Sequence, residues 1–278
     1  MKSKPGLKMR VLTAVVGIPV IILILLAPPA VMLGAVVLCS IVGLFEFYGA
    51  VKLRDKPLLC AVGFVGAVII PLCVFVQPKH MLIGAFSYLL ILFVIMLLSQ
   101  KKILFTDISL SVMSLIYIPF LLSHILFIRR MEFGNILVWL VFLGAFMTDS
   151  CAFFAGKALG RHKLCTNISP KKTIEGAVGG IVGCGLAFLL FAFIVNVYLS
   201  PWLSGYVMSY GRMFVLGLIC AVTAQIGDLT ASLIKRQFGI KDFGNLFPGH
   251  GGMLDRCDSI VLVAPTVFLF ALQFGLFI

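Results

Sequence analysis

The sequence predicts an all-α polytopic integral membrane protein with about nine transmembrane helices and a cytoplasmic N-terminus. Hydrophobic residues make up 62% of the 278 residues, whereas soluble domains contain about 45–50% apolar residues. Charged residues make up only 12%, and the mean hydropathy is +1.17. Most of the uncharged runs approach or exceed the ~20 residues that a spanning helix requires.

The first uncharged run, residues 11–45, is expected to hold parts of two spans. One straight helix of that length would measure about 52 Å at 1.5 Å per residue, too long for a hydrocarbon core of ~30 Å. Pro28 and Pro29 therefore predict a tight turn between two helices. The nine expected spans are 11–28, 30–51, 58–76, 81–99, 107–128, 135–155, 177–199, 212–235 and 257–277.

The distribution of Lys and Arg predicts the orientation of these spans. With the N-terminus inside, 18 of the 22 basic residues fall in inner segments, which agrees with the positive-inside rule. We therefore expect a multi-pass protein of the cell inner (plasma) membrane, with its active site on the cytoplasmic face. The net charge of +12 follows mostly from this topology. No soluble basic domain or aromatic-basic surface is present to bind nucleic acid, and anionic lipid headgroups are the better partners for the excess charge.

The chain is expected to divide by role. Residues 1–134 predict an N-terminal transmembrane scaffold of five helices. Residues 135–278 predict a C-terminal catalytic region of four helices with cytoplasmic loops at 156–176 and 236–256. Within the scaffold, Glu46 is an unusual residue, because placing a carboxylate in a transmembrane span costs free energy. Two interpretations stay open for it: an interfacial side chain close to Lys52, or a structural or site role.

A polar stretch, residues 228–258, interrupts the apolar C-terminal half. If one helix continues to Arg236, then Asp228, Ser232, Lys235 and Arg236 lie on one helical face. Asp255 and Asp258 are spaced i, i+3, so their side chains would be neighbours on a helix and would repel. A cation between the two carboxylates would relieve this repulsion.

A second polar region begins at Asp149, about two turns inside the membrane edge, where a carboxylate requires a partner. Lys171, Lys172 and Glu175 follow in the next loop. These three residues either have a functional role or only form a solvent-exposed face. Ser169 and Pro170 could mark the start of a helix.

The sequence has no Walker loop, because Lys172 and Thr173 lack the preceding glycine pattern. Backbone N–H groups of a glycine-rich turn could bind an anion together with nearby cations. A tight interhelical turn is the alternative for these glycines. His250 could bind phosphate or only order the turn. The turn glycines are Gly249, Gly251 and Gly252, and the cations are Lys235, Arg236, Lys241 and Arg256.

The polar stretch is similar to the signature of the phosphatidate cytidylyltransferases, also called CDP-diacylglycerol synthases. Thirteen spaced positions match, which is far more specific than a lone glycine motif. The Thr-Asp-Ser at 148–150 and the Ser-Pro-Lys-Lys-Thr-Ile-Glu-Gly at 169–176 also resemble this family. The thirteen positions are Ser232, Lys235, Arg236, Lys241, Asp242, Pro248, Gly249, His250, Gly251, Gly252, Asp255, Arg256 and Asp258.

The resemblance implies that a phosphate oxygen of phosphatidate attacks the α-phosphorus of CTP, which gives CDP-diacylglycerol and pyrophosphate. It also implies Mg²⁺, with Mn²⁺ as an alternative and a second cation as an option, and a homodimer. The implied metal ligands are Asp228, Asp255, Asp258 and Asp149. The implied catalytic residues are Asp228, Asp255, Asp258, Lys235, Arg236, His250 and Arg256. The implied substrate-binding residues are Ser232, Lys241, Asp242, Gly249, Gly251, Gly252, Lys171, Lys172 and Glu175.

Two other functions compete with this expectation. A transporter or lipid flippase would also place charges and broken helices in the membrane, but it would use a proton relay or ligand groups near the midplane. A membrane kinase for polyprenols, or another CTP-dependent lipid enzyme, would differ only in the acceptor or the transferred group.

Overall fold

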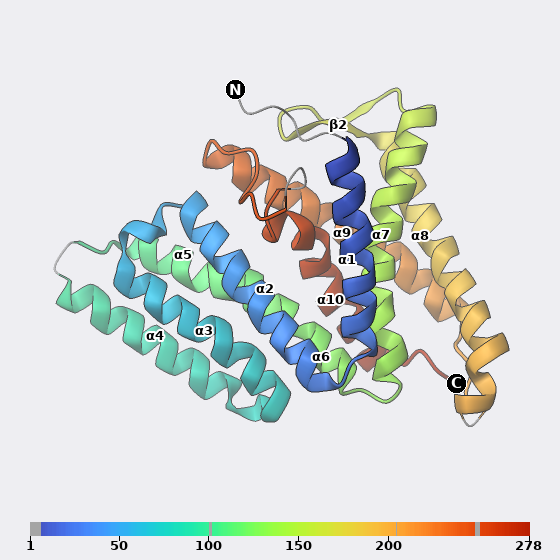
Figure 1. Cartoon of the computed structure of the whole chain (residues 1–278), viewed down its shortest axis with the longest axis horizontal. Helices are drawn as coiled ribbons and strands as arrows, with labels where there is room; N and C mark the ends of the chain where they lie inside the picture. The colour runs from blue at the N-terminus through green and yellow to red at the C-terminus, as the bar shows by residue number, and fades with distance from the viewer. Residues whose placement is uncertain (1–6, 100–101, 204, 248–250) are drawn as a thin grey trace. The chain divides into compact units, whose positions relative to one another are not determined.

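The computed structural model describes residues 7–99, 102–203, 205–247 and 251–278 (Figure 1). In this part of the chain, eight helices are long and apolar enough to cross a membrane, so the protein is a multi-pass membrane protein. The first helix contributes a further apolar segment, Val15–Leu26. The helices are α1 (Leu7–Leu26), α2 (Pro29–Ala50), α3 (Pro57–Val76), α4 (Met81–Leu98), α5 (Phe105–Leu115), α6 (His124–Arg129), α7 (Gly134–Leu159), α8 (Ile174–Ile194), α9 (Tyr210–Gln237) and α10 (Leu254–Phe274).

The expected turn at Pro28 and Pro29 is confirmed. Helix α1 ends at Leu26, and α2 begins with Pro29 in its first turn. Proline is favoured there because the first helical N–H has no acceptor within the helix, so its loss costs nothing. The long apolar run at the N-terminus is therefore two helices.

The span Phe105–Arg129 is one apolar segment that contains an irregular turn. Helices α5 and α6 are joined through a π-helical turn at Ile116–Phe120, which includes Pro119. Proline removes one backbone donor and clashes with the preceding turn, and this explains why the regular helix is interrupted at that point.

The chain forms two compact units, which are described separately. The first contains residues 1–131 and 235–257, and the second contains residues 132–234 and 258–278. Segment 235–257 therefore packs with the N-terminal helices of the first unit. The expected division by role at residue 134 stays a prediction.

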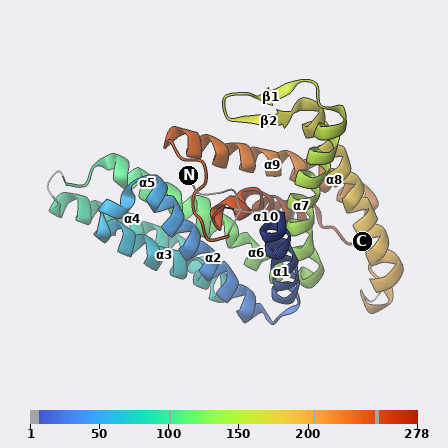
Figure 2. The same ribbon diagram turned by 45° about the horizontal axis from the view of Figure 1, so that its top comes forward.

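In the first unit, α2, α3, α4 and α5 lie side by side (Figure 2). The apolar side chains of Leu44, Phe47 and Ile118 are buried between these helices. Tyr48 is also buried, and its hydroxyl accepts a hydrogen bond from Ser114 at 3.2 Å. Only 11% of the apolar stretch of α4 is buried, against 39% for α3, so α4 leaves most of its apolar surface to its surroundings.

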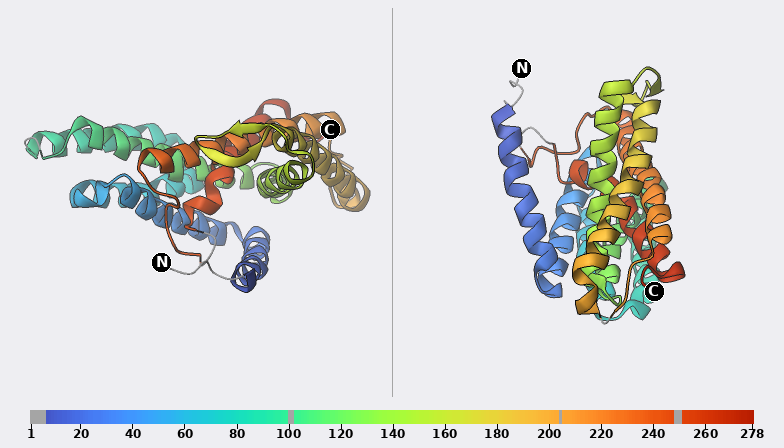
Figure 3. Two further views of the ribbon diagram at one scale, coloured as in Figure 1. Left: turned by 90° about the horizontal axis from the view of Figure 1, so that it is seen from above. Right: turned by 90° about the vertical axis from the view of Figure 1, so that its right-hand side faces the viewer.

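In the second unit, α7 and α8 run alongside one another (Figure 3). Small residues permit this close approach. A Cβ atom on Gly179 would overlap Ala155, and one on Gly183 would overlap Cys151. Helices can pack at this distance only where side chains are absent or small.

A two-stranded hairpin connects α7 to α8, with antiparallel strands β1 (Lys163–Cys165) and β2 (Ser169–Thr173). The alternative that Ser169 caps a helix beginning at Pro170 is wrong. Helix α8 begins at Ile174, and Thr173 is its N-cap, because its hydroxyl accepts the Gly176 N–H at 3.1 Å. A Ser-Pro pair is compatible with both a helix start and a short strand, and pairing with β1 decides for the strand.

Candidate functional site

Helix α9 carries the beginning of the polar stretch, with Asp228 in its C-terminal half and Lys235 in its last turn. The helix ends in a Schellman motif: Ile240 N–H donates to the Lys235 carbonyl at 2.9 Å, and Gly239 N–H donates to the Arg236 carbonyl at 3.1 Å. Gly239 has a φ of 68°, a left-handed conformation that glycine adopts without strain. The expected continuous helix to Arg236 is confirmed.

In the first unit, Asp255 in the first turn of α10 is the centre of a buried polar cluster. Its Oδ1 accepts a hydrogen bond from Lys235 Nζ at 2.7 Å, and the two side chains are only 3% and 11% exposed. Its Oδ2 accepts the N–H groups of Phe243 and Gly252, each at 2.9 Å. A carboxylate offers about four acceptor directions, so three donors leave little of Asp255 unused. We call Lys235, Phe243, Gly252 and Asp255 the Asp255 cluster.

The aromatic ring of Phe243 supports this cluster from one side. The Lys235 ammonium lies 5.4 Å from the centre of that ring, a distance at which cation and ring attract one another. Phe243 also packs against Phe47 of α2, with ring centres 6.3 Å apart. The ion pair is thus shielded from solvent by an apolar wall.

Glu46 on α2 belongs to the same region of the first unit. It is buried, its Oε1 accepts the Met253 N–H, and its Oε2 accepts the Leu254 N–H, both at 2.9 Å. Of the two interpretations left open, the structure supports the structural role, since these contacts satisfy the first N–H groups of α10. The sequence could not reveal it because the partners are about 207 residues away and are backbone atoms.

Gly251 and Gly252 are the two predicted turn glycines that lie within the described residues. Gly251 has a φ of 86°, and a Cβ atom there would lie 2.8 Å from Asp255 Oδ2. Both facts require glycine. The other predicted turn residues, Pro248, Gly249 and His250, lie outside the described residues, so their predicted roles stay predictions.

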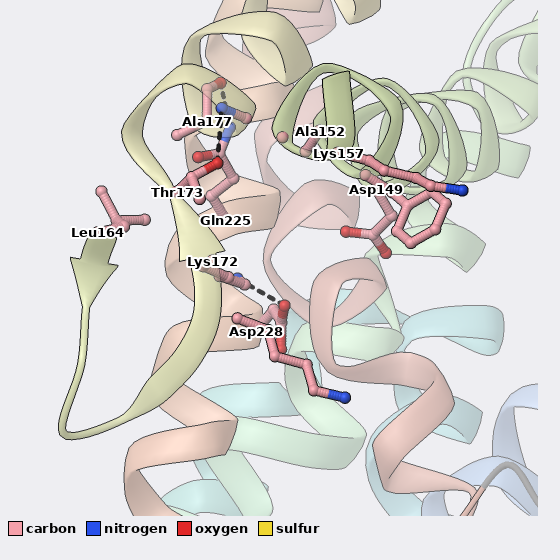
Figure 4. Close-up of a pocket in the computed structure, with 13 residues that line it drawn as sticks. Asp149, Ala152, Lys157, Leu164, Lys172, Thr173, Ala177, Gln225 and Asp228 are labelled. Atoms are coloured by element: carbon pink, nitrogen blue, oxygen red, sulfur yellow. Dashed lines mark hydrogen bonds and ion pairs between the residues drawn. The ribbon is translucent and has the colours of Figure 1, made fainter. Parts of the chain in front are cut away.

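In the second unit, a cavity of about 460 Å³ opens between α7, β2, α8 and α9 (Figure 4). Ligand sites commonly measure about 300–1,000 Å³. Lys172 from β2 and Asp228 from α9 point toward one another across it, with Nζ and Oδ2 2.6 Å apart. The polar side chains that line the cavity are Asp149, Lys157, Lys171, Lys172, Thr173, Gln225 and Asp228.

Two carboxylates, Asp149 and Asp228, therefore share a cavity with three lysines. Oxygen atoms are the ligands that Mg²⁺ prefers, and nucleotide-dependent enzymes commonly hold it through one or two carboxylates plus substrate phosphates. The donor set of this cavity fits such an ion. Among the described residues, no three His, Cys, Asp or Glu side chains lie close enough together to hold a metal by themselves.

Asp258 lies in α10 close to the helix that carries Asp228. A Cβ atom on Gly227 would lie 2.5 Å from the Asp258 carbonyl oxygen, so α9 and α10 are in close contact at this point of the second unit. The Asp258 carboxylate also accepts the Ser259 N–H at 2.8 Å. The prediction that Asp255 and Asp258 bind a cation is not tested by these contacts and stays a prediction.

Glu175 does not line the cavity. Its carboxylate accepts the N–H groups of Arg161 and His162 at 3.1 and 3.2 Å, and it contacts His162 Nδ1 at 2.6 Å. These contacts connect the start of α8 to the chain that follows α7. They describe a structural role, and the predicted substrate contact stays a prediction.

The remaining predicted residues are more exposed or make local contacts. Ser232 donates to Asp228 at 3.4 Å, and Arg236 reaches the Ile240 carbonyl at 3.5 Å. Lys241, Asp242 and Arg256 are exposed. Their roles in catalysis and substrate binding stay predictions.

Lys157, Thr173 and Gln225 were not predicted as site residues, although they line the cavity. Gln225 donates to the Ala177 carbonyl at 3.1 Å, which connects α9 to α8. Gln225 and Asp228 are spaced i, i+3 on α9, so helical periodicity from Asp228 could have identified it. The spacing from Asp149 to Lys157 on α7, two turns, could have identified the lysine in the same way.

Comparison with known proteins agrees with these motifs. Residues 8–274 match the model of the cytidylyltransferase family. A phosphatidate cytidylyltransferase of Staphylococcus aureus (strain COL) is 30% identical over 270 residues, which cover 96% of this chain and 100% of the relative. One from Rickettsia bellii is 40% identical over 184 residues, 66% of this chain and 78% of the relative. One from Rickettsia felis is 36% identical over 208 residues, 74% and 89% of the two chains.

Proposed function

Because this chain belongs to the cytidylyltransferase family and its homologues over nearly the full length are phosphatidate cytidylyltransferases, we propose that it transfers the cytidylyl group of CTP to phosphatidate. The reaction is a nucleotidyl transfer for phospholipid biosynthesis. An oxygen of the lipid phosphate forms a bond to the α-phosphorus of CTP, the bond from that phosphorus to the β-phosphate oxygen breaks, and pyrophosphate leaves. The products are CDP-diacylglycerol and pyrophosphate.

The cavity of the second unit is the observation that most directly supports a nucleotide site. It brings Lys157, Lys171 and Lys172 together with two carboxylates, Asp149 of α7 and Asp228 of α9. Two polyanionic substrates repel: a like-charge pair at 4 Å costs about 4 kcal/mol at an effective dielectric constant of 20. Ammonium groups reduce this cost, so the lysines are suited to hold the triphosphate.

The nucleophile needs no strong base, because the phosphate of phosphatidate is already anionic. The residues would therefore act by positioning the substrates and by stabilising charge. We infer that Lys172 exchanges its partner. In the structure it forms an ion pair with Asp228, and a phosphate group of CTP would replace Asp228 as the partner of Lys172. The exchange would leave the Asp228 carboxylate available.

Asp149 and Asp228 are the residues that we propose to hold a divalent cation. That Asp255 and Asp258 are metal ligands stays a prediction from the sequence. Mg²⁺ or Mn²⁺ bound there would polarise the phosphoryl group and orient the triphosphate. Lys157 and Lys171 would bind the outer phosphates from the side of α7 and β2. A second cation stays a prediction.

The placement of the enzyme in the cell is proposed from the basic residues. Their predominance in inner segments supports an active site on the cytoplasmic face of the inner (plasma) membrane, where CTP is available. Phosphatidate stays in the bilayer and CTP is dissolved in water, so the cavity has to be accessible from both at the lipid–water boundary. A homodimer is proposed from the resemblance alone.

Purified protein with CTP, Mg²⁺ and phosphatidate tests the reaction. Release of pyrophosphate together with cytidine attached to the lipid is the expected result. Release of CDP with a phosphorylated lipid would favour a kinase, and no turnover of CTP would favour a transporter. Omission of phosphatidate is the control, since pyrophosphate released without lipid would indicate simple hydrolysis.

A further inference from the structure

Glu46 is a buried acidic residue within an apolar helix, and the signature motif does not include it. It is 5% exposed and lies four residues before the end of α2, at Ala50. An ionised carboxylate in such surroundings requires strong hydrogen-bond donors. A residue of this kind in an otherwise apolar span suggests a specific task.

Both carboxylate oxygens bind the start of α10. Oε1 accepts the Met253 N–H and Oε2 accepts the Leu254 N–H, each at 2.9 Å. The first N–H groups of a helix have no acceptor within the helix, and the helix dipole favours a negative charge beside them. Glu46 is thus an N-terminal cap that comes from a different helix.

The loop leading into α10 is fitted closely around this carboxylate. A Cβ atom on either Gly244 or Gly252 would overlap the Glu46 carboxyl group, so both glycines lie directly against it. Glu46 therefore contacts the loop at two points, Gly244 and Gly252, and the backbone at both points is fitted to its carboxylate.

Asp255 holds the same segment from the other side. Its Oδ2 accepts the N–H groups of Phe243 and Gly252, while its Oδ1 accepts Lys235. Four backbone N–H groups are thus divided between two carboxylates: those of Phe243 and Gly252 donate to Asp255, and those of Met253 and Leu254 donate to Glu46. A shift of the Glu46 contacts would also shift Asp255 and its ion pair.

We propose that Glu46 is a positioning residue for the reaction: it fixes the backbone of Met253 and Leu254 and thereby sets the orientation of Asp255 toward Lys235. This inference rests on the proposed function, because Asp255 and Lys235 are predicted catalytic residues. The hydrogen bonds of Glu46 among the described residues go to the backbone N–H groups of Met253 and Leu254, so it acts through the backbone.

The substitution Glu46→Gln tests the proposal, because glutamine keeps the shape but turns an N–H donor toward one of the two backbone donors. We expect kcat to fall at least tenfold, while the KM for CTP changes less than threefold, since Glu46 does not line the nucleotide cavity. We also expect amide hydrogen exchange of residues 251–255 to accelerate at least tenfold. A purely structural role would lower the amount of folded protein without changing kcat per folded molecule.

Leu44→Ala is the matched control, because Leu44 is fully buried on the same helix and its truncation destabilises α2 while the Glu46 carboxylate is kept. It should lower the thermal stability and leave kcat and the exchange of residues 251–255 within twofold of the native protein. If Glu46→Gln does not accumulate, Glu46→Asp keeps the charge but is one methylene shorter. For it we expect kcat to fall at least threefold, with faster exchange.

A kcat for Glu46→Gln within twofold of the native value, or an equal fall in Leu44→Ala, would overturn the proposal. Faster exchange with unchanged kcat would overturn it too. If the native protein forms no lipid-linked cytidine, the proposed function fails, and the positioning role in this reaction fails with it. Hydrogen exchange distinguishes that case, since it reports the contact between Glu46 and α10 whether or not the enzyme is active.

Discussion

Two lysine–aspartate pairs, one in each compact unit, differ in how freely they can rearrange. Lys172 and Asp228 are 25% and 27% exposed, whereas Lys235 and Asp255 are 11% and 3% exposed. Partly exposed pairs contribute about 0–1 kcal/mol, and breaking a buried pair by removing one partner costs about 3–5 kcal/mol. We therefore expect Lys172 to exchange its partner during the reaction and Lys235 to keep its partner.

Lys172→Met tests the first part. We expect the KM for CTP to rise about tenfold, because one charge-assisted hydrogen bond to a phosphate, about 1.5–3 kcal/mol, is lost. The control is Lys163→Met, an exposed lysine of β1 outside the cavity, which should leave the KM unchanged. Equal effects of the two substitutions would contradict a specific contact between Lys172 and the nucleotide.

Asp255→Asn tests the second part. We expect turnover to be abolished while the protein still inserts into the membrane, and we expect its thermal stability to fall, since Lys235 is left buried beside a neutral partner. The double variant with Lys235→Met removes the unpaired charge. It should recover stability but not activity. Near-normal activity of Asp255→Asn would refute a catalytic role for this carboxylate.

At the scale of elements, the C-terminus of α9 helps to position the chain that follows it. Lys235 takes part twice: its carbonyl accepts the Ile240 N–H, and its side chain binds Asp255. The left-handed Gly239 turns the chain back toward the helix axis. The geometry of the Asp255 cluster thus depends on a helix terminus as well as on side-chain contacts.

Gly239→Ala is expected to destabilise the protein by about 1 kcal/mol, because an L-residue is strained at positive φ. No other atom lies within 4 Å of the added carbon, so backbone strain is the only cause. Gly211→Ala, in the first turn of α9, is the control, because it also has open space around it and its φ is not positive. It should be neutral or stabilising by about 0.4–1 kcal/mol, since alanine loses less backbone entropy on folding than glycine. Denaturant or thermal unfolding in detergent measures the difference, and equal stabilities of the two variants would contradict the account.

The hairpin between α7 and α8 shows why element boundaries are harder to predict than spans. The spans follow from apolar runs of about 20 residues, and the expected ranges agree with the helices to within a few residues over most of the chain. Strands β1 and β2 have three and five residues, too short for a recognisable alternation. Only their pairing with one another distinguishes Ser169–Thr173 from the first turn of a helix.

At the scale of the whole molecule, two of the four basic residues in the expected outer segments, Arg129 and Arg130, have structural tasks of their own. Arg129 donates to the Ala27 carbonyl at the end of α1 at 3.0 Å, and Arg130 donates to the Val74 carbonyl near the end of α3 at 2.8 Å. Cations at helix C-termini are stabilising because the carbonyl groups there lack partners. These residues therefore do not weaken the charge argument for the orientation.

The orientation predicts that the C-terminus lies outside the cytoplasm. A reporter enzyme that is active only outside, such as alkaline phosphatase, should be active when fused after Ile278. The same reporter should be inactive when fused within the basic loop at 156–176. Fluorescence of a green fluorescent protein fused after Ile278 would contradict the orientation, since that protein folds poorly when exported through the general secretion route.

The sequence by itself determined that this protein spans a membrane many times, where its helices lie, and which family signature it carries, because those properties depend on local hydrophobicity and on residue spacing. The tertiary structure decided which polar residues meet. It placed Lys172 against Asp228 in one cavity, Lys235 against Asp255 in a buried cluster, and Glu46 beneath the start of α10. Such contacts join residues up to about 208 positions apart, and several involve backbone groups that any residue could provide. No local pattern in the sequence can specify them.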